Sequence, residues 1–176
     1  MAADETHKGF KTLTADNWRD LDEVTQYFSR DPDTWIVAFL QPQLGSQVPQ
    51  DISALFEVAR GAMIYGWHFY PLLTLGMEQC YRINEAGLRV RCKQLEIATA
   101  VVSKNGNERP RSFLDLQREL MARGVIPAGD VVFWDAARDL RNWASHPEQQ
   151  PILPPGEALA ILRRTAEMLD VLFRAP

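Results

Sequence analysis

The sequence predicts an all-α protein, folded as an up-and-down helical bundle of four to five main helices with an N-terminal helical extension. Three observations lead to this fold class. Apolar residues recur at intervals of three and four, helix-capping residues stand where such runs begin, and no stretch alternates apolar with polar residues as a half-buried strand does. The chain has 176 residues, of which 46% are hydrophobic and 24% charged, and this composition excludes disorder for most of its length.

The first 50 residues are predicted to form an acidic, partly helical extension. Met1–Leu13 is polar and predicts a tail, and Thr14–Phe28 predicts a first helix that Thr14 caps. A short apolar piece, Trp35–Leu40, follows, and Gln41–Gln50 predicts a connector to the main domain at residues 51–176. The apolar side expected for the first helix consists of Trp18, Leu21, Val24 or Thr25, and Phe28.

Two long helices are expected to open the main domain. Asp51 is the candidate N-cap of the first, and Pro71 ends or kinks it because proline lacks an amide hydrogen. The second runs from Leu72 to about Val101, and a polar turn follows at Ser103–Pro110. The inward residues expected are Leu55, Val58, Ala59 and Ala62 on the first helix, and Leu72, Leu75 or Gly76, Gln79 or Cys80, Ile83, Gly87 and Val90 on the second.

Local signals define three further helices. Ser112, with Asp115 three residues later, predicts a capping box, and Gly124 is placed to end that helix. Asp130 is the candidate cap of the next helix, which runs towards Ser145. The last helix opens at Pro154-Pro155, and its apolar residues Leu159, Leu162, Ala166, Leu169 and Phe173 repeat at the spacing of a helix-bundle interface.

Charge and leader signals bear on the compartment and the partners. The formal net charge of −4 argues against a strongly basic coat protein for nucleic acid. Residues 1–50 carry 4 basic and 8 acidic side chains, and the rest of the chain carries 15 of each. The main domain is therefore neutral as a whole and can contain local basic patches. The start has no apolar secretory core, and an uncharged run from Gly61 contains His68 and Pro71, which favours a broken buried helix over a membrane span. We therefore expect a cytoplasmic protein.

The sequence predicts neither a metal site nor a cofactor. It contains no glycine-rich phosphate loop and no His-Glu-x-x-His pair. His7, His68 and His146 are scattered, and Cys80 and Cys92 are twelve residues apart. On one helix the two cysteines would lie about 18 Å from each other, which is too far for a disulfide.

The most informative segment is Arg138–Pro147, with the sequence RDLRNWASHP. Pro147 disfavours helical geometry at the residue before it, so His146 is expected at or just beyond the last helical turn. Asn142 and His146 share a helix face, whereas Arg141 lies about 100° from Asn142. A loosened last turn would let these three side chains line one cavity.

These residues resemble a known family. Arg141-Asn142-x-x-x-His146, late in an all-helical domain, is similar to the Arg-x(4–6)-His motif of the HEPN superfamily, the higher eukaryote and prokaryote nucleotide-binding domains. The helices around Tyr70–Leu73 and Glu78–Arg82 resemble the long central helices of bacterial members, and the terminal helix resembles their closing helix. The resemblance covers residues 51–174 and leaves the extension without an interpretation.

The resemblance implies metal-independent cleavage of RNA by a homodimer, with the two motifs facing each other across a shared cleft. His146 would be the general acid and base, because its ordinary pKa of about 6.5 suits proton transfer near neutrality. Arg141 would hold the scissile phosphate, and Asn142 would orient the imidazole or the phosphate. Such a protein would serve as a toxin or an antiviral defence effector.

One position departs from the family pattern. Some family toxins carry a tyrosine two residues after the histidine, where a nucleotidyltransferase antitoxin modifies them, and this chain has Glu148 there. The departure argues against that particular pairing and leaves a different antitoxin or protein partner open.

Two further interpretations stay open for the basic residues. Arg82, Arg89 and Lys93 form one stripe along a helix and, with Arg138, are candidates for contacts to RNA phosphates, although for the stripe a solvated face is the favoured explanation. Arg141 near a helix end is also suited to pairing with Asp135 or Asp139. The alternative function is accordingly a non-catalytic HEPN-like module for dimerisation, protein docking or nucleotide binding.

Overall fold

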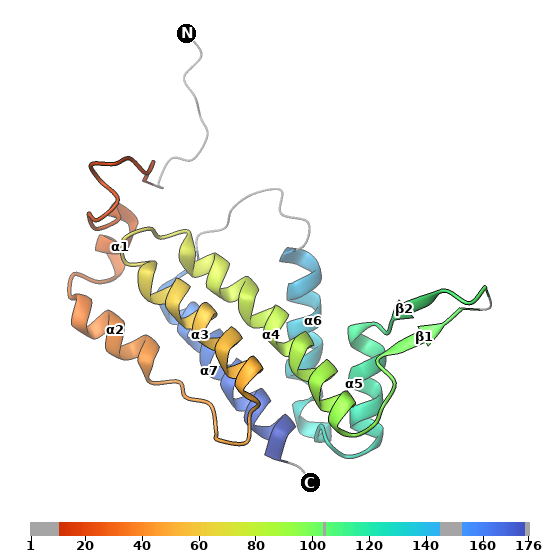
Figure 1. The fold of residues 1–176 in the computed structure, drawn as a ribbon. Coiled ribbons are helices and arrows are strands. Elements are labelled where there is room, and N and C mark those ends of the chain that lie inside the picture. Colours follow the sequence, from red (N-terminus) through yellow and green to blue (C-terminus); the bar gives the residue numbers. More distant parts are fainter. Residues whose placement is uncertain (1–10, 104, 145–152, 175–176) are drawn as a thin grey trace.

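The fold is a bundle of helices with one small hairpin, which confirms the predicted all-α class (Figure 1). It is seen in a computed structural model that describes residues 11–103, 105–144 and 153–174. Most of the predicted tail Met1–Leu13 and all of the segment around His146 lie outside these described residues. Within them, no helix combines the length and the apolar composition that a membrane crossing needs.

The first helix, α1, is shorter than predicted and spans Glu23–Phe28. Thr14 does not cap it; instead its amide donates to Asn17 Oδ1 at 2.9 Å, and the Asn17 amide donates to Thr14 Oγ1 at 3.2 Å. Such side-chain bonds to the backbone compete with helix formation, so this segment forms a turn. The cap is the buried Asp22, whose Oδ1 accepts from the Val24 amide at 3.0 Å.

Asp22 also fastens the extension to the main domain. Its second oxygen, Oδ2, accepts from the Tyr70 amide at 3.0 Å, and the Thr25 hydroxyl donates to the Gly66 carbonyl at 3.2 Å. Burial raises the pKa of the Tyr70 hydroxyl above its ordinary range, and the Asp22 charge adds to that effect. The two hydrogen bonds to Gly66 and Tyr70 thus attach the N-terminal extension to the segment that joins the next two long helices.

The apolar piece Trp35–Leu40 belongs to a second helix, α2 (Pro32–Leu40). Asp31 caps this helix and Pro32 is its first residue. Proline is favourable there because the first residue of a helix needs no amide hydrogen for a helical hydrogen bond. Trp35 and Phe39 are buried, and the Trp35 indole donates to the carbonyls of Met63 and Ile64 at 3.2 and 3.1 Å. Side chains of the extension thus share one core with residues 51–176.

Helix α3 (Gln50–Tyr65) has Pro49, not Asp51, at its cap position, and its buried face differs from the predicted one. Ala59 is buried as expected, but Val58 is 59% exposed. The buried side is rotated by about one residue because α3 packs against both α2 and α4, and the sequence alone does not give the direction of these neighbours. The core residues of α3 are Ile52, Phe56, Ala59, Arg60 and Met63.

Helix α4 (Leu72–Gln94) is the central helix and contacts α3, α5, α6 and α7. Its start after Pro71 and the inward positions Gly76, Cys80, Ile83 and Gly87 are confirmed, whereas Leu75 is 51% exposed. The helix ends at Gln94 and not near Val101. A hydrogen bond from the Ile97 amide to the Cys92 carbonyl, at 2.8 Å, closes the end of the helix. Glu96, which precedes Ile97, has the left-handed φ of 56° that is typical of a helix C-terminus.

A two-stranded hairpin replaces the end of the predicted helix and much of the predicted turn. Strands β1 (Ala100–Val102) and β2 (Glu108–Pro110) pair antiparallel, with Val101 opposite Arg109. Both strands are short and mostly exposed, so they lack the alternation of apolar and polar residues that marks a strand in sequence. Gly106, at a φ of 78°, lies in the loop between them, as expected for a turn glycine.

The remaining helices follow their local signals closely. They are α5 (Phe113–Ala122), α6 (Val131–Ala144), which follows the short 3-10 turn η1 (Ala128–Asp130), and α7 (Pro155–Arg174). The capping box of Ser112 and Asp115 is confirmed, and the Ser112 hydroxyl lowers the pKa of the Asp115 carboxyl by hydrogen bonding to it. Gly124 follows α5 at a φ of 71°, the left-handed geometry of a helix end.

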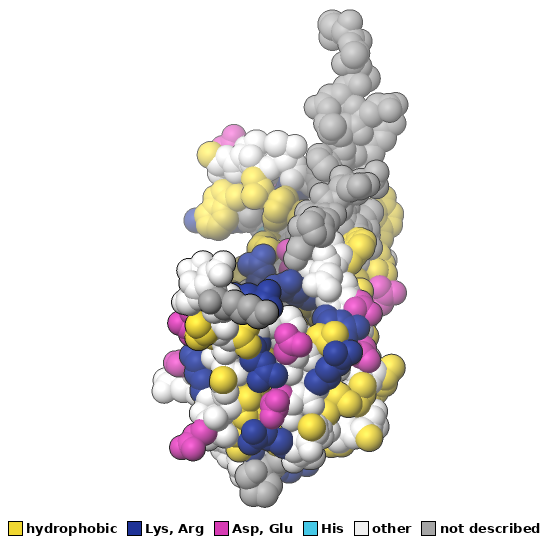
Figure 2. All heavy atoms as spheres, turned by 90° about the vertical axis from the view of Figure 1, so that its right-hand side faces the viewer, with side chains coloured by type: hydrophobic (Ala, Val, Ile, Leu, Met, Phe, Trp, Pro, Cys, Tyr) yellow, Lys and Arg dark blue, Asp and Glu magenta, His cyan; other side chains and the backbone are white. Residues whose placement is uncertain are grey.

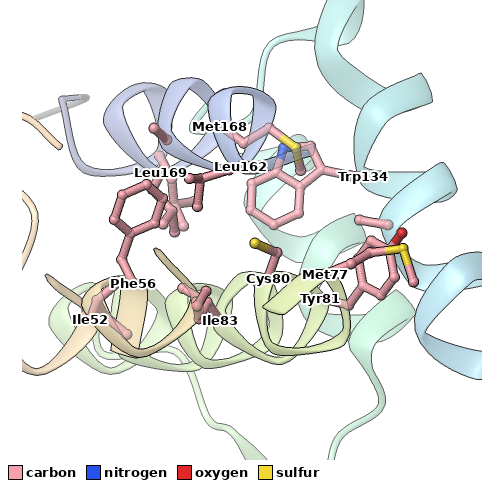
Figure 3. Close-up of a cluster of buried hydrophobic side chains, with 14 of the residues drawn as sticks. Ile52, Phe56, Met77, Cys80, Tyr81, Ile83, Trp134, Leu162, Met168 and Leu169 are labelled. Carbon is pink, nitrogen blue, oxygen red and sulfur yellow. The ribbon is translucent and has the colours of Figure 1, made fainter. Parts of the chain in front are cut away.

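The core lies where α3, α4, α6 and α7 converge (Figure 3). Phe56 of α3, Cys80 and Ile83 of α4, Trp134 of α6 and Leu169 of α7 meet there. Both cysteines are buried and free, and burial raises the pKa of the Cys80 thiol to about 12. The apolar spacing of the last helix is confirmed, because Leu162, Ala166, Leu169 and Phe173 are all buried.

Two glycines set how closely α4 approaches its neighbours. A Cβ atom at Gly76 would lie 2.6 Å from Met63 Cγ and 2.9 Å from the Ala59 carbonyl oxygen. A Cβ at Gly87 would lie 2.7 Å from Leu169 Cδ2. The packing of α3 and α7 on α4 therefore leaves no space for a side chain at either position.

We expect Gly76→Ala and Gly87→Ala each to lower the free energy of unfolding by about 1–3 kcal/mol, because the added methyl group overpacks these contacts. Urea denaturation measures the change. Gly61→Ala is the matched control, since nothing lies within 4 Å of its Cβ position on α3, and it should gain about 0.5–1 kcal/mol. Equal effects in all three variants would contradict this account of the packing.

Candidate functional site

An open hollow of about 540 Å³ lies between α4, α6 and the segment that joins β2 to α5. Figure 2 shows Lys and Arg side chains gathered on this side of the molecule. The hollow brings together parts of the chain that are far apart in sequence, and we call it the arginine hollow. Its lining is Glu85 and Arg89 from α4, Pro110, Arg111, Ser112, Phe113 and Leu114 from the joining segment, and Arg138, Arg141 and Asn142 from α6.

Arg141 lines this hollow in the last turn of α6. Its Nη2 lies 3.0 Å from Glu85 Oε2, and its Nη1 donates to Asn142 Oδ1 at 3.3 Å. The side chain is 41% exposed. The ion pair with Glu85 fixes the end of α6 against the middle of α4.

Glu85 serves two arginines at once. Its Oε1 accepts from Arg89 Nη2 at 2.8 Å while its Oε2 faces Arg141, and the carboxylate is only 18% exposed. Arg89 Nη2 also donates to the Arg111 carbonyl at 3.0 Å. Both guanidinium groups are thus held in fixed positions at the wall of the hollow, since each is anchored through an atom that faces the protein.

Arg138 is held by its own helix. Its Nη1 lies 2.8 Å from Asp135 Oδ1 and its Nη2 lies 2.9 Å from Asp139 Oδ1. Hydrogen bonding to Asp139 is the main reason that the pKa of Arg138 is raised above its ordinary value. Asp135 also accepts from Gln117 Nε2 at 3.1 Å, which ties α6 to α5. The two aspartates proposed as partners of Arg141 are therefore engaged with Arg138, and Arg141 pairs with Glu85.

The structure separates the predicted basic stripe on α4. Arg89 lines the hollow, whereas Arg82 and Lys93 are exposed positions outside its lining. The stripe spans 11 residues, or about 16 Å along a helix, and the joining segment covers only its middle. Of the predicted contacts to RNA, Arg89 and Arg138 are brought together with Arg141 and Asn142, and the other two are not.

His146 lies outside the described residues, so its position relative to Arg141 stays a prediction. The two tryptophans near the motif have different environments. Trp134 is buried, with its ring 6.2 Å from that of Phe113, and Trp143 is 52% exposed. Among the described residues, no group of three or more His, Cys, Asp or Glu side chains is arranged to hold a metal ion.

Sequence reasoning did not include Glu85 or Arg111 in the site. The i,i+4 spacing of Glu85 and Arg89 was a local signal for an ion pair. No local signal connects Glu85 with Arg141, because the pair forms only when α6 packs on α4. Arg111 is fixed by the Ala98 carbonyl at 3.2 Å and by Glu119 at 3.5 Å, which places it beside the cap of α5.

The arginine hollow has the electrostatics of an anion site. Within its described lining, four arginines face one glutamate. The N-terminus of α5 at Ser112 adds a partial positive charge from the helix dipole. The described lining therefore carries more positive than negative charge, and the carboxylates Asp135, Asp139 and Glu119 that pair with Arg138 and Arg111 stand outside it.

Fold and site together define a helical-bundle protein with an arginine-lined surface cavity. No family model, no curated protein and no solved structure matches this chain.

We expect Glu85→Gln to tighten the binding of a labelled single-stranded RNA oligonucleotide about threefold to tenfold, because the amide removes the one negative charge in the lining. Fluorescence anisotropy at fixed salt measures the affinity. Glu157→Gln, at an exposed position in the first turn of α7, is the control for net charge and should change the affinity by less than about twofold. Weaker binding by Glu85→Gln would mean that positioning the two arginines outweighs their neutralisation.

Proposed function

We propose that this protein is a HEPN-type endoribonuclease that cleaves RNA without a metal ion, in the cytoplasm, as a homodimer. The observation that carries the proposal is the placement of Arg141 and Asn142 at the rim of an open cavity that Arg89, Arg111 and Arg138 complete. His146 follows the last residue of α6 by two positions, and the chain keeps its Cα within about 8 Å of that of Ala144. A phosphate binder and a proton-transfer group are therefore neighbours in the covalent chain.

The chemistry would be attack of a ribose 2′-hydroxyl on the adjacent phosphorus. The new bond joins the 2′-oxygen to phosphorus while the bond from phosphorus to the 5′-oxygen breaks, leaving a 2′,3′-cyclic phosphate and a free 5′-hydroxyl. His146 of one subunit would take the 2′-hydroxyl proton, and His146 of the other would protonate the leaving oxygen. Arg141 would stabilise the charge that develops on the phosphate, and Asn142 would orient the phosphate or the imidazole.

Exposed apolar side chains on α6 support the homodimer. Leu140 is 40% exposed and Trp143 is 52% exposed, and they flank Arg141 and Asn142 in sequence. Large apolar and aromatic residues at the edge of a polar site are typical of the centre of an interface between subunits. A dimer built on this end of α6 would bring two copies of the motif close together.

A second candidate function is a HEPN-like module without catalysis that binds a nucleotide or docks a protein partner. Two sets of ion pairs favour this second function: Arg138 pairs with Asp135 and Asp139, and Arg141 pairs with Glu85. These carboxylates already use some of the N–H groups with which each arginine would hold a scissile phosphate. A role as a toxin or defence effector would add a separate antitoxin as partner, and Glu148 argues against the tyrosine-modifying type.

Cleavage of mixed-sequence RNA in the presence of a metal chelator tests the enzyme. Wild-type protein should produce 2′,3′-cyclic phosphate ends, and His146→Ala and Arg141→Ala should each reduce the rate by at least about a hundredfold, the usual contribution of a general acid or base. Arg82→Ala and Lys93→Ala are matched controls from outside the hollow and should retain activity. A folded, dimeric wild type that cleaves nothing would refute the ribonuclease, as would full activity of His146→Ala.

Salt dependence distinguishes the arginines of the hollow from the rest. Arg89→Ala and Arg138→Ala should each weaken RNA binding and reduce the slope of log affinity against log salt by about one, because each loses one phosphate contact. Arg82→Ala should leave the slope unchanged. A titration by anisotropy between low and moderate salt measures all three, and equal slopes in every variant would contradict RNA binding at the hollow.

A further inference from the structure

A second cavity lies on a different face of α6 from the arginine hollow. It is bounded by α4, α6 and α7, has a volume of about 280 Å³, and is called the α6–α7 groove here. Figure 3 shows two of its lining residues, Tyr81 on α4 and Met168 on α7. The apolar walls are formed by Phe133, Ala137 and Leu140 of α6 and by Ile161 and Met168 of α7.

Two residues that line this groove each carry a buried polar atom for which the described part of the chain supplies no partner. The Tyr81 hydroxyl and the Asn84 side-chain oxygen are buried, in residues that are 3% and 1% exposed, and neither has a hydrogen-bond partner among the described residues. Buried polar atoms in folded proteins are nearly always paired. Because Tyr81 and Asn84 are three residues apart on α4, their side chains lie next to each other on the same face.

The chemistry of the two groups is complementary to one kind of ligand edge. A phenol oxygen donates or accepts a hydrogen bond, and an amide oxygen only accepts. Burial raises the pKa of the Tyr81 hydroxyl above its ordinary value, so the phenol keeps its proton. A carbonyl oxygen on the ligand would therefore accept from Tyr81, and a neighbouring N–H would donate to Asn84.

We propose that the α6–α7 groove binds a small planar organic molecule that carries an N–H beside a carbonyl group, as in a cyclic amide. Apolar lining residues of α6 and α7, among them Leu140 and Ile161, would cover its ring. Arg164 of α7 also lines the groove, with its guanidinium 3.9 Å from the centre of the Phe133 ring.

Binding of three bicyclic probes to the full chain tests this ligand chemistry. 2-Quinolinone has both groups, N-methyl-2-quinolinone has lost the donor, and quinoline has lost the carbonyl. We expect 2-quinolinone to shift the NMR signals of α6 and α7 and to bind at least fivefold more tightly than either analogue, since each analogue leaves one buried atom unpaired. Equal affinities of the three probes, or no binding of 2-quinolinone up to its solubility limit, would overturn the proposal.

The variant Tyr81→Phe separates a ligand site from a structural role. It should weaken 2-quinolinone binding at least fivefold without lowering the melting temperature of the free protein, because the hydroxyl that it removes has no partner there. Tyr65→Phe, at a 65% exposed position on α3, is the control and should leave both quantities unchanged. Unchanged binding by Tyr81→Phe would also overturn the proposal. These measurements use no RNA, so their result does not depend on whether the protein is a ribonuclease.

Discussion

The close approach of α4 to both α3 and α7 is the constraint on which the rest of this structure depends. Gly76 lets the α3 backbone and Met63 come within contact distance, and Gly87 does the same for Leu169 on α7. A helix packed on several sides has a fixed axial position and rotation, since side chains in a close-packed core cannot shift independently. α4 is therefore the rigid reference for every other element.

The arginine hollow inherits its geometry from that rigid helix. Glu85 lies on α4 between the buried Ile83 and Gly87, so its carboxylate has a fixed place from which it holds Arg89 and Arg141. This arrangement places one negative charge, that of Glu85, among the arginines of the lining. In return two guanidinium groups are held in position by the protein itself, which would reduce the ordering that binding of an anion requires.

Helix α6 presents different faces to different surroundings. Trp134 and Ala137 enter the core, Arg138, Arg141 and Asn142 line the arginine hollow, and Phe133 and Leu140 line the α6–α7 groove. The bonds of Asp135 to Gln117 and of Arg141 to Glu85 hold the helix on the side of the hollow, and the Phe133 ring contacts the Arg164 guanidinium of α7 on the side of the groove. A ligand in the groove would contact its opposite side, so the two cavities share one wall.

The sequence by itself determined what depends on neighbouring residues: the helical class, the Ser112–Asp115 capping box, the end of α5 at Gly124 and the apolar spacing of α7. Tertiary structure decided what depends on distant partners. The start of α1 follows from the bond of Asp22 to the Tyr70 amide, and the buried face of α3 follows from α2 and α4. The hairpin pairs residues that are close in sequence, but its short exposed strands carry no periodic pattern from which to predict it. Arg141 and Asn142 were found from a local motif. Their partner Glu85 was not, because residues 56 positions apart meet only when packing places two helices side by side.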